Sequence, residues 1–238
     1  MMLVFDPVAH SYKNEFTGEF YNSVTRVIHK FKKPFDADTA ASRVAKREGI
    51  TKEEVKERWK KDNDKSKDYG TELHAVIEKY LKTGTFDPEY TIFIQAFLDL
   101  DIVSKKDDLR IEYQVYSHEY KLAGTSDLIR DEKNGGFSVF DLKTNKKFNM
   151  FNPYNEYLLS PLEHLTASEY SIYSLQLSTY AYMYQNITGR RVNNIGVFYY
   201  DRNTEKFTYY PMSYKKYDVL AMLNHYKTYE LHRSNHSE

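Results

Sequence analysis

Two aspartates and a lysine in the middle of the sequence have the types and the spacing that phosphate chemistry uses. Asp127 ends the segment Gly124-Thr125-Ser126-Asp127, and Asp141-Leu142-Lys143 follows fourteen residues later. Side chains two apart on a strand face the same way, so Asp141 and Lys143 share a face. The Asn134-Gly135-Gly136 turn signal predicts that their strand folds back beside the strand of Asp127. Two carboxylates and an ammonium group would then meet on one side of a hairpin.

Opposed carboxylates repel each other unless a cation lies between them, and hard divalent ions prefer oxygen ligands. A neighbouring lysine can orient or deprotonate a water and stabilise charge in phosphoryl transfer. The ordinary alternative is a solvated strand that carries a cross-strand ion pair. The apolar residues Val139 and Phe140, directly before the motif, instead favour an interior strand.

Two pairs of residues on predicted helices could join this site. His74 and Glu78 are one turn apart and share a helix face. Neutral imidazole binds Mn²⁺ and similar ions, although a lone histidine on a helix is more often structural. Gln176 and Tyr180 are one turn apart on an almost entirely apolar helix, where polar groups need partners. Those partners could be active-site groups or simply each other.

Taken together and in this order, the motifs resemble the RecB-like branch of the PD-(D/E)XK nucleases. The set is Gly70-x-x-x-His74, Gly124-Thr125-Ser126-Asp127, Asp141-Leu142-Lys143 and Gln176-x-x-x-Tyr180. Phage exonucleases and the mitochondrial genome maintenance exonuclease carry similar arrangements. The resemblance covers roughly residues 68–185. Each motif is weak alone, and their common order is what makes the resemblance specific.

The resemblance implies hydrolysis of DNA phosphodiesters with Mg²⁺ or Mn²⁺ as cofactor. By this likeness Asp127 and Asp141 would bind the metal, with His74 as a further ligand and Leu142 counted through its backbone. Lys143 would position or activate the attacking water, and Gln176 and Tyr180 would support the site or hold the strand. Glu112 and Glu78 rank lower, as acidic groups that would support the ligands from behind. Asp141 stands where many relatives have glutamate.

The DNA itself would be held by basic and aromatic side chains near the site. Phosphates attract lysine and arginine, whereas unstacked bases attract aromatic rings. The main candidates are Lys146, Lys147, Tyr69 and Phe148; weaker ones are Lys46, Arg47, Phe151, Tyr154, Arg190 and Arg191. Residues 145–165 lack periodicity and predict a loop beside the active site that shapes substrate entry.

The surrounding pattern predicts an α/β (α+β) fold with a central mixed sheet flanked by helices, a PD-(D/E)XK restriction-endonuclease-like core. A β-hairpin is expected within residues 3–28, and a strand meander within 111–143. The other expected strands form a hairpin over 192–200 and 206–210. Helices are expected over 36–46, 51–62, 68–82, from Pro88, over 168–186 and over 214–232. We expect one nuclease domain over 1–238, in which residues 1–67 form the N-terminal hairpin and helices, 68–210 the core and 211–238 a C-terminal helix.

Composition limits the function classes. The 238 residues include 34 Lys and Arg, 34 Asp and Glu and no Cys, which excludes thiolate zinc sites and iron–sulfur clusters. No apolar run approaches the roughly 18 residues of a membrane span, and the N-terminus does not resemble a signal peptide. We therefore expect no membrane association and a cytoplasmic location, in a bacterial or phage-infected cell. No helicase P-loop is present.

These observations favour a divalent-metal-dependent exonuclease acting on DNA ends or single strands in replication, repair or recombination. A recombination or replication protein is a possible partner, and the sequence does not determine the oligomeric state. Three alternatives remain open: a structure-specific endonuclease of the same fold, a non-catalytic DNA-end-binding module, and an enzyme acting on another phosphate ester.

Overall fold

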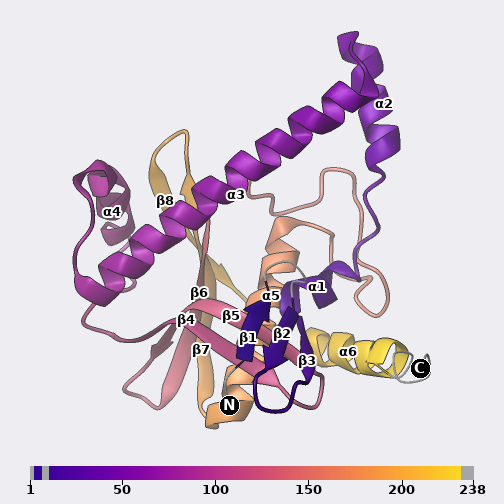
Figure 1. Ribbon diagram of the computed structural model, residues 1–238. Helices are drawn as coiled ribbons and strands as arrows, with labels where there is room; N and C mark the ends of the chain where they lie inside the picture. Colours follow the sequence, from indigo (N-terminus) through magenta and orange to yellow (C-terminus); the bar gives the residue numbers. More distant parts are fainter. Residues whose placement is uncertain (1–2, 7–10, 232–238) are drawn as a thin grey trace.

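A computed structural model describes residues 3–6 and 11–231. Its eight strands form one mixed sheet in the order β1-β2-β3-β5-β6-β7-β8, with β4 paired to β5 (Figure 1). The strands are β1 (Leu3–Asp6), β2 (Ser11–Asn14), β3 (Phe20–Ser23), β4 (Asp108–Ser117), β5 (Leu122–Asp131), β6 (Gly136–Lys143), β7 (Arg191–Asp201) and β8 (Lys206–Met212). The pairs β3–β5 and β6–β7 are parallel, and the others are antiparallel.

Helices cover both faces of this sheet. They are α1 (Val24–His29), α2 (Ala37–Glu48), α3 (Lys52–Thr83), η1 (Pro88–Tyr90), α4 (Thr91–Leu98), α5 (Glu169–Thr188), α6 (Lys216–Tyr226) and the π-helical turn η2 (Lys227–Leu231). One apolar core lies between the sheet and α1, α5 and α6, and a second lies between the sheet and α3 and α4. On β6, Phe137 and Val139 enter the first core, whereas Phe140 and Leu142 enter the second. This alternation gives Asp141 and Lys143 the α5 side of the sheet.

The predicted fold class is confirmed, and the elements follow the expected order. Two predictions were wrong: residues 3–28 contain three strands and most of α1 instead of a hairpin alone, and the helices expected over 51–62 and 68–82 are a single helix, α3. The capping box of Thr51 and Glu54 begins α3, and Gly84 ends it with φ of 75°. The polar stretch between the two expected helices contains no proline, so nothing in it forces a break.

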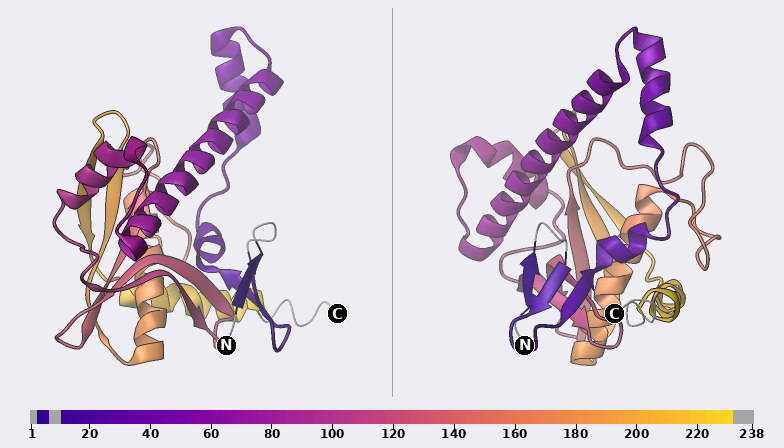
Figure 2. Two further views of the ribbon diagram at one scale, coloured as in Figure 1. Left: turned by 60° about the vertical axis from the view of Figure 1, so that its left-hand side comes forward. Right: turned by 45° about the vertical axis from the view of Figure 1, so that its right-hand side comes forward.

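Helix α3 is long because half of it leaves the body of the protein. Figure 2 shows its first half projecting away from the sheet with α2 packed beside it. Ala41, Ala45 and Val55 form the small apolar contact between these two helices. Away from that contact the projecting part faces solvent, which explains its polar sequence. Only the second half of α3, from Tyr69 onward, packs on the sheet.

Strand β5 has β4 along one edge but two different strands along the other. Ser23 of β3 pairs with Ala123 near its start, and Phe140 of β6 pairs with Leu128 further along. Residues 124–127 lie between these two contacts. The sheet therefore opens into a fork, and the segment Gly124–Asp127 lies in its opening.

Gly124 allows α5 to approach this fork closely. A Cβ atom at this position would lie 2.5 Å from Cε1 of the Tyr180 ring, well inside van der Waals contact. The two sequence motifs that carry Gly124 and Tyr180 are therefore in direct contact, although they are 56 residues apart in the chain. Glycine at 124 is required by packing and not by a turn.

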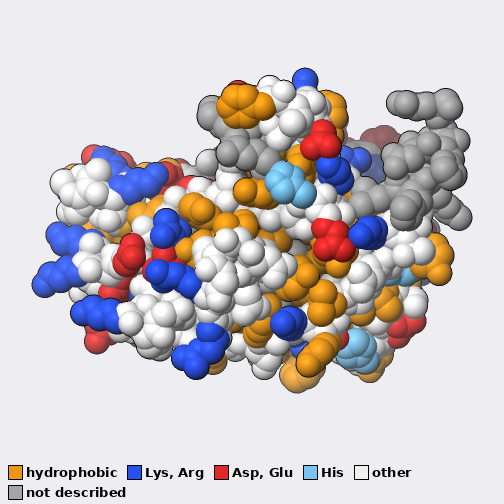
Figure 3. Space-filling view, turned by 90° about the horizontal axis from the view of Figure 1, so that it is seen from below, with side chains coloured by type: hydrophobic (Ala, Val, Ile, Leu, Met, Phe, Trp, Pro, Cys, Tyr) orange, Lys and Arg blue, Asp and Glu red, His pale blue; other side chains and the backbone are white. Residues whose placement is uncertain are grey.

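The C-terminal helix expected over 214–232 is α6 followed by η2, while His232 lies outside the described residues. Within the described part of the chain, none of the helices has both the length and the apolar run needed to cross a membrane. On the face seen from below, Lys and Arg side chains are interspersed with acidic and apolar ones (Figure 3). This face therefore carries no continuous basic field.

We predict that Gly124→Ala lowers the free energy of unfolding by about 1–3 kcal/mol, because the added methyl group collides with the Tyr180 ring. Urea denaturation followed by circular dichroism measures the loss. In a Tyr180→Leu background the same substitution should cost much less, because the clashing ring atoms are gone. An equal cost in both backgrounds would show that the ring is not the obstacle.

Candidate active site

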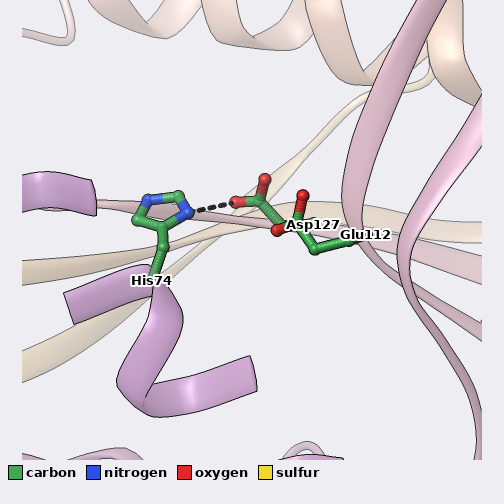
Figure 4. A group of neighbouring side chains, drawn as sticks. All are labelled: His74, Glu112 and Asp127. Carbon is green, nitrogen blue, oxygen red and sulfur yellow. Dashed lines mark ion pairs between the residues drawn. The ribbon is translucent and has the colours of Figure 1, made fainter. Parts of the chain in front are cut away.

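Three side chains from α3, β4 and β5 point toward one another at the opening of the fork (Figure 4). They are His74, Glu112 and Asp127, and one ligand atom from each lies within 4.8 Å of the other two. The His74 Nδ1 atom is 3.4 Å from Asp127 Oδ2. An imidazole nitrogen and two carboxylate oxygens at this separation form a donor set suited to Mn²⁺ or Mg²⁺.

Asp127 is held by the backbone of the neighbouring strand. Its Oδ2 atom accepts a 2.8 Å hydrogen bond from the backbone N–H of Leu142. The regular pairing of β5 and β6 has just ended at Leu128 and Phe140, so this carboxylate takes the place of the next strand-to-strand contact. The bond fixes Asp127 and ties it to the Asp141-Leu142-Lys143 segment.

Asp141 and Lys143 form a buried ion pair next to this group. The Lys143 Nζ atom is 2.6 Å from Asp141 Oδ2, and only 3% of the Asp141 side chain is exposed. Burial and the negative charge of Asp127 raise the pKa of Asp141 above its usual range, although Lys143 opposes the shift. Burial would lower the pKa of Lys143, but the charges of Asp141 and Asp127 outweigh it and raise that pKa. Lys143 is therefore a cation in the folded protein.

Glu112 occupies an unfavourable position in two respects. Its φ of 50° lies in the left-handed region, which a residue with a Cβ rarely adopts. The register on either side places it directly opposite Asp127. Although Glu112 is solvent-accessible, crowding by protein atoms removes part of its hydration, and Asp127, Glu78 and Asp141 repel its charge. Together these effects raise the pKa of Glu112 to about 7.

Gln176 and Tyr180 lie behind the carboxylates on α5. The Gln176 Nε2 atom donates a 3.1 Å hydrogen bond to the Tyr180 hydroxyl, so each provides the partner that the apolar helix lacks. Burial, together with the charge of Asp141, raises the pKa of Tyr180 well above its usual range. Tyr180 therefore remains a neutral hydroxyl beside the acidic cluster.

The cluster lies in an open cleft made of adjoining hollows. Glu112 and Asp127 line both a hollow of about 360 Å³ under α3 and one of about 330 Å³ on the side of β2 and Tyr180. A narrow apolar hollow that continues toward Phe97 and Phe198 shares the same two residues. Water and a phosphate can therefore reach these carboxylates from two sides.

A divalent ion fits this set of residues. Three acidic groups, Glu112, Asp127 and Asp141, repel one another across the fork. Positive charge near Asp127 would relieve this repulsion. His74, Glu112 and Asp127 are the three residues best placed to hold the ion, with Asp141 directly behind them. Glu78, also predicted to support the site, forms an ion pair with Lys82 and lines the same hollow.

The predicted DNA-binding residues fall into two groups. Lys146 and Lys147 are exposed, as are Phe151 and Tyr154. Other candidates already have partners within the protein: Tyr69 lies under the Arg202 guanidinium, Phe148 stacks on Tyr173 and Tyr210, Arg47 pairs with Glu48 and Arg190 pairs with Asp131. The rings of Tyr69 and Phe148 therefore contribute to packing near the site.

Sequence reasoning missed one residue of the site and ranked another too low. The Lys143 ammonium group lies 4.7 Å from the centre of the Tyr173 ring, a cation–π contact that fixes its direction. Tyr173 lies one helical turn before Gln176, which was the available signal. The position of Glu112 beside His74 and Asp127 depends on its left-handed backbone conformation, which the sequence does not indicate.

Comparison with known proteins identifies the family. The family model described as the PD-(D/E)XK nuclease superfamily matches residues 22–230, nearly the whole chain. A search of curated proteins found no match. Several solved structures are similar at a low level, among them the following two. The protein SSO0001 has 13% identity and a TM-score of 0.41, with 87% of this chain and 74% of that chain covered. A candidate exonuclease from Eubacterium rectale has 12% identity and a TM-score of 0.46, with 92% and 82% covered.

We predict opposite effects of Glu112→Gln with and without metal. Ionised Glu112 destabilises the folded state above pH 7, and the penalty disappears below pH 4.5, where the group is protonated in both states. In EDTA at pH 8 the variant should therefore be more stable than wild type by about 1 kcal/mol, after allowance for solvent screening.

With Mn²⁺ the order should reverse, because wild type has the extra ligand and gains more from binding. Melting temperatures in EDTA and in Mn²⁺ measure both effects. Equal Mn²⁺ stabilisation of the two proteins would remove Glu112 from the ligand set.

Proposed function

The chain belongs to the PD-(D/E)XK nuclease superfamily, and on this basis we propose that it is a divalent-metal-dependent DNA exonuclease. The observation that carries this proposal is the convergence of Asp127, Asp141 and Lys143 with His74 at the opening of the fork in the sheet. Three elements, α3, β5 and β6, contribute these four side chains. Mg²⁺ or Mn²⁺ is the proposed cofactor.

Each residue has a distinct role in the proposed reaction. Asp127 and His74, with Glu112 and Asp141, would hold the ion; the backbone of Leu142 remains a predicted ligand. The bound ion would supply Lewis acidity toward the phosphate and lower the charge repulsion that opposes attack by water. Lys143, fixed between Asp141 and the Tyr173 ring, would orient the water and offset negative charge on the phosphate.

Gln176 and Tyr180 would act by holding the acidic group in place. The Tyr180 ring packs on Gly124, next to the strand segment that carries Asp127. Its hydroxyl is bonded to Gln176 and stays neutral beside Asp141. These contacts support a positioning role behind the carboxylates.

An exonuclease acting on ends or single strands is preferred to an endonuclease for a geometric reason. The carboxylates lie at the floor of a cleft bounded by α3 on one side and by β2 and Tyr180 on the other. A strand end enters such a cleft more easily than the middle of a stiff duplex does. We further propose a role in replication, repair or recombination.

We predict that Asp141→Asn and Lys143→Ala each lower the cleavage rate by at least about 10²–10³-fold, because each removes a charge that would act at the phosphate. The assay follows end-labelled single-stranded DNA, labelled duplex and a covalently closed circle in Mg²⁺, Mn²⁺ or EDTA. Metal-dependent loss of linear DNA that spares the circle is expected, and the position of the label gives the polarity.

Lys133→Ala is the matched control for Lys143→Ala, since it removes an exposed lysine on the turn between β5 and β6, at the opposite end of β6 from Lys143, and should cleave at nearly the wild-type rate. Cutting of the circle would instead assign an endonuclease. Binding of DNA without cleavage under any metal would assign a non-catalytic module, and loss of folding in the variants would mean that the ion pair is structural.

A further inference from the structure

A second groove lies beside the active site, between the start of the projecting helices and the loop that follows β6. It has a volume of about 770 Å³. One wall is the connection from α1 to α2 and the first turns of α2, and the other is the 149–157 segment with the N-terminus of α5. We call it the side groove. None of the residues of the acidic cluster lines it.

Exposed aromatic rings stand on both walls of the side groove. Phe35 is 74% exposed on one wall, and Tyr154 is 82% exposed on the other, with Tyr157 half exposed nearby. Exposed rings at such a density on a folded surface usually mark an interaction site. Exposed rings on the walls of a groove can stack on flat groups.

Both rings are mounted on ordered structure. The Asn152 side chain donates to Ala167 O at 2.9 Å and accepts from the backbone N–H of Tyr154 at 2.8 Å, which fixes the turn that carries Tyr154. Pairing of Tyr157 with Thr166 closes this loop further. On the opposite wall, the Phe35 ring lies 6.3 Å from the Trp59 ring of α3. The rings therefore need little ordering when they bind.

Cations without ion pairs accompany the rings. Lys32, Lys33 and Arg43 line the groove, and among the described residues no ion pair engages any of them. Three carboxylates also line it. Asp36, the N-cap of α2, and Glu169, in the first turn of α5, each lie at the positive end of a helix, which offsets part of their negative charge.

Helix α5 runs from the side groove to the residue that contacts Lys143. Glu169 lines the groove, and Tyr173, whose ring contacts Lys143, lies one helical turn further on. That turn is about 5.4 Å long, a distance of the order of one or two nucleotides. A strand held in the groove could therefore place a phosphate near Lys143.

We propose that the side groove binds single-stranded DNA a few nucleotides from the scissile phosphate, with bases stacked on Phe35 and Tyr154 and phosphates paired with Lys33 and Arg43. This inference rests on the proposed nuclease function and adds its substrate class. Single strands are favoured over duplex because the bases of a duplex are already stacked on one another and are not free to stack on the rings. A protein partner would use the rings but would not require the bases.

The test measures the anisotropy of fluorescein-labelled dT15 in EDTA, which prevents metal-dependent cleavage. Phe35→Ala and Tyr154→Ala should each weaken binding roughly tenfold. For an abasic strand of the same length, both variants should have the same affinity as wild type, since this strand has phosphates but no bases to stack. Lys33→Ala should instead reduce the slope of log affinity against log salt by about 0.7.

Phe16→Ala is the matched control, because it removes a ring that is 79% exposed on the β2–β3 turn and outside the groove. It should bind dT15 as wild type does. Wild-type affinity in both ring variants, or an equal loss for dT15 and the abasic strand, would overturn the proposal. If wild type binds dT15 through the rings but cleaves no DNA with any metal, the groove stands and the nuclease proposal fails. If the ring variants bind and cleave as wild type does while Asp141→Asn is inactive, the nuclease proposal is supported and the groove proposal fails.

Discussion

The hydrogen bond from the Leu142 backbone to the Asp127 carboxylate is the contact on which the site depends. The backbone pairing of β5 and β6 ends just before this point, and the Asp127 side chain provides the next contact between the two strands. Without it, Asp127 would be free to rotate away from His74, and the Asp141-Leu142-Lys143 segment would lose its link to β5. One bond thus sets both the position of the Asp127 carboxylate and the direction of the strand that carries Asp141 and Lys143.

The acidic groups collected around this bond oppose the stability of the ion-free protein. Asp127, Asp141 and Glu112 repel one another, and Glu112 also has an unfavourable backbone conformation. Packing elsewhere must compensate, which is why rigid neighbours surround the cluster: Gly124 against Tyr180 on one side and Lys143 over Tyr173 on the other. Such an arrangement is typical of a site that gains stability when a cation binds.

The connection from α1 to α2, the first turns of α2 and the loop after β6 extend the protein beyond this compact centre. Their facing walls present aromatic rings and cations that contribute little to the core. The net charge of zero agrees with this picture, since attraction for a polyanion would be local, in one groove, and not spread over the surface. The face seen from below, where charges of both signs alternate, is consistent with this (Figure 3).

The sequence alone determined the fold class, the strands and helices that carry the motifs, and the shared face of Asp141 and Lys143, because these follow from local periodicity and turn chemistry. It did not determine that residues 51–83 form one helix, since the polar residues in the middle of that segment suit a solvent-exposed helix as well as a break. The position of Glu112 beside His74 and Asp127, and the contact of Lys143 with Tyr173, depended on tertiary structure. A left-handed backbone angle, a forked strand and a ring beneath an ammonium group arise only when distant segments pack together, and neither residue type nor spacing records them.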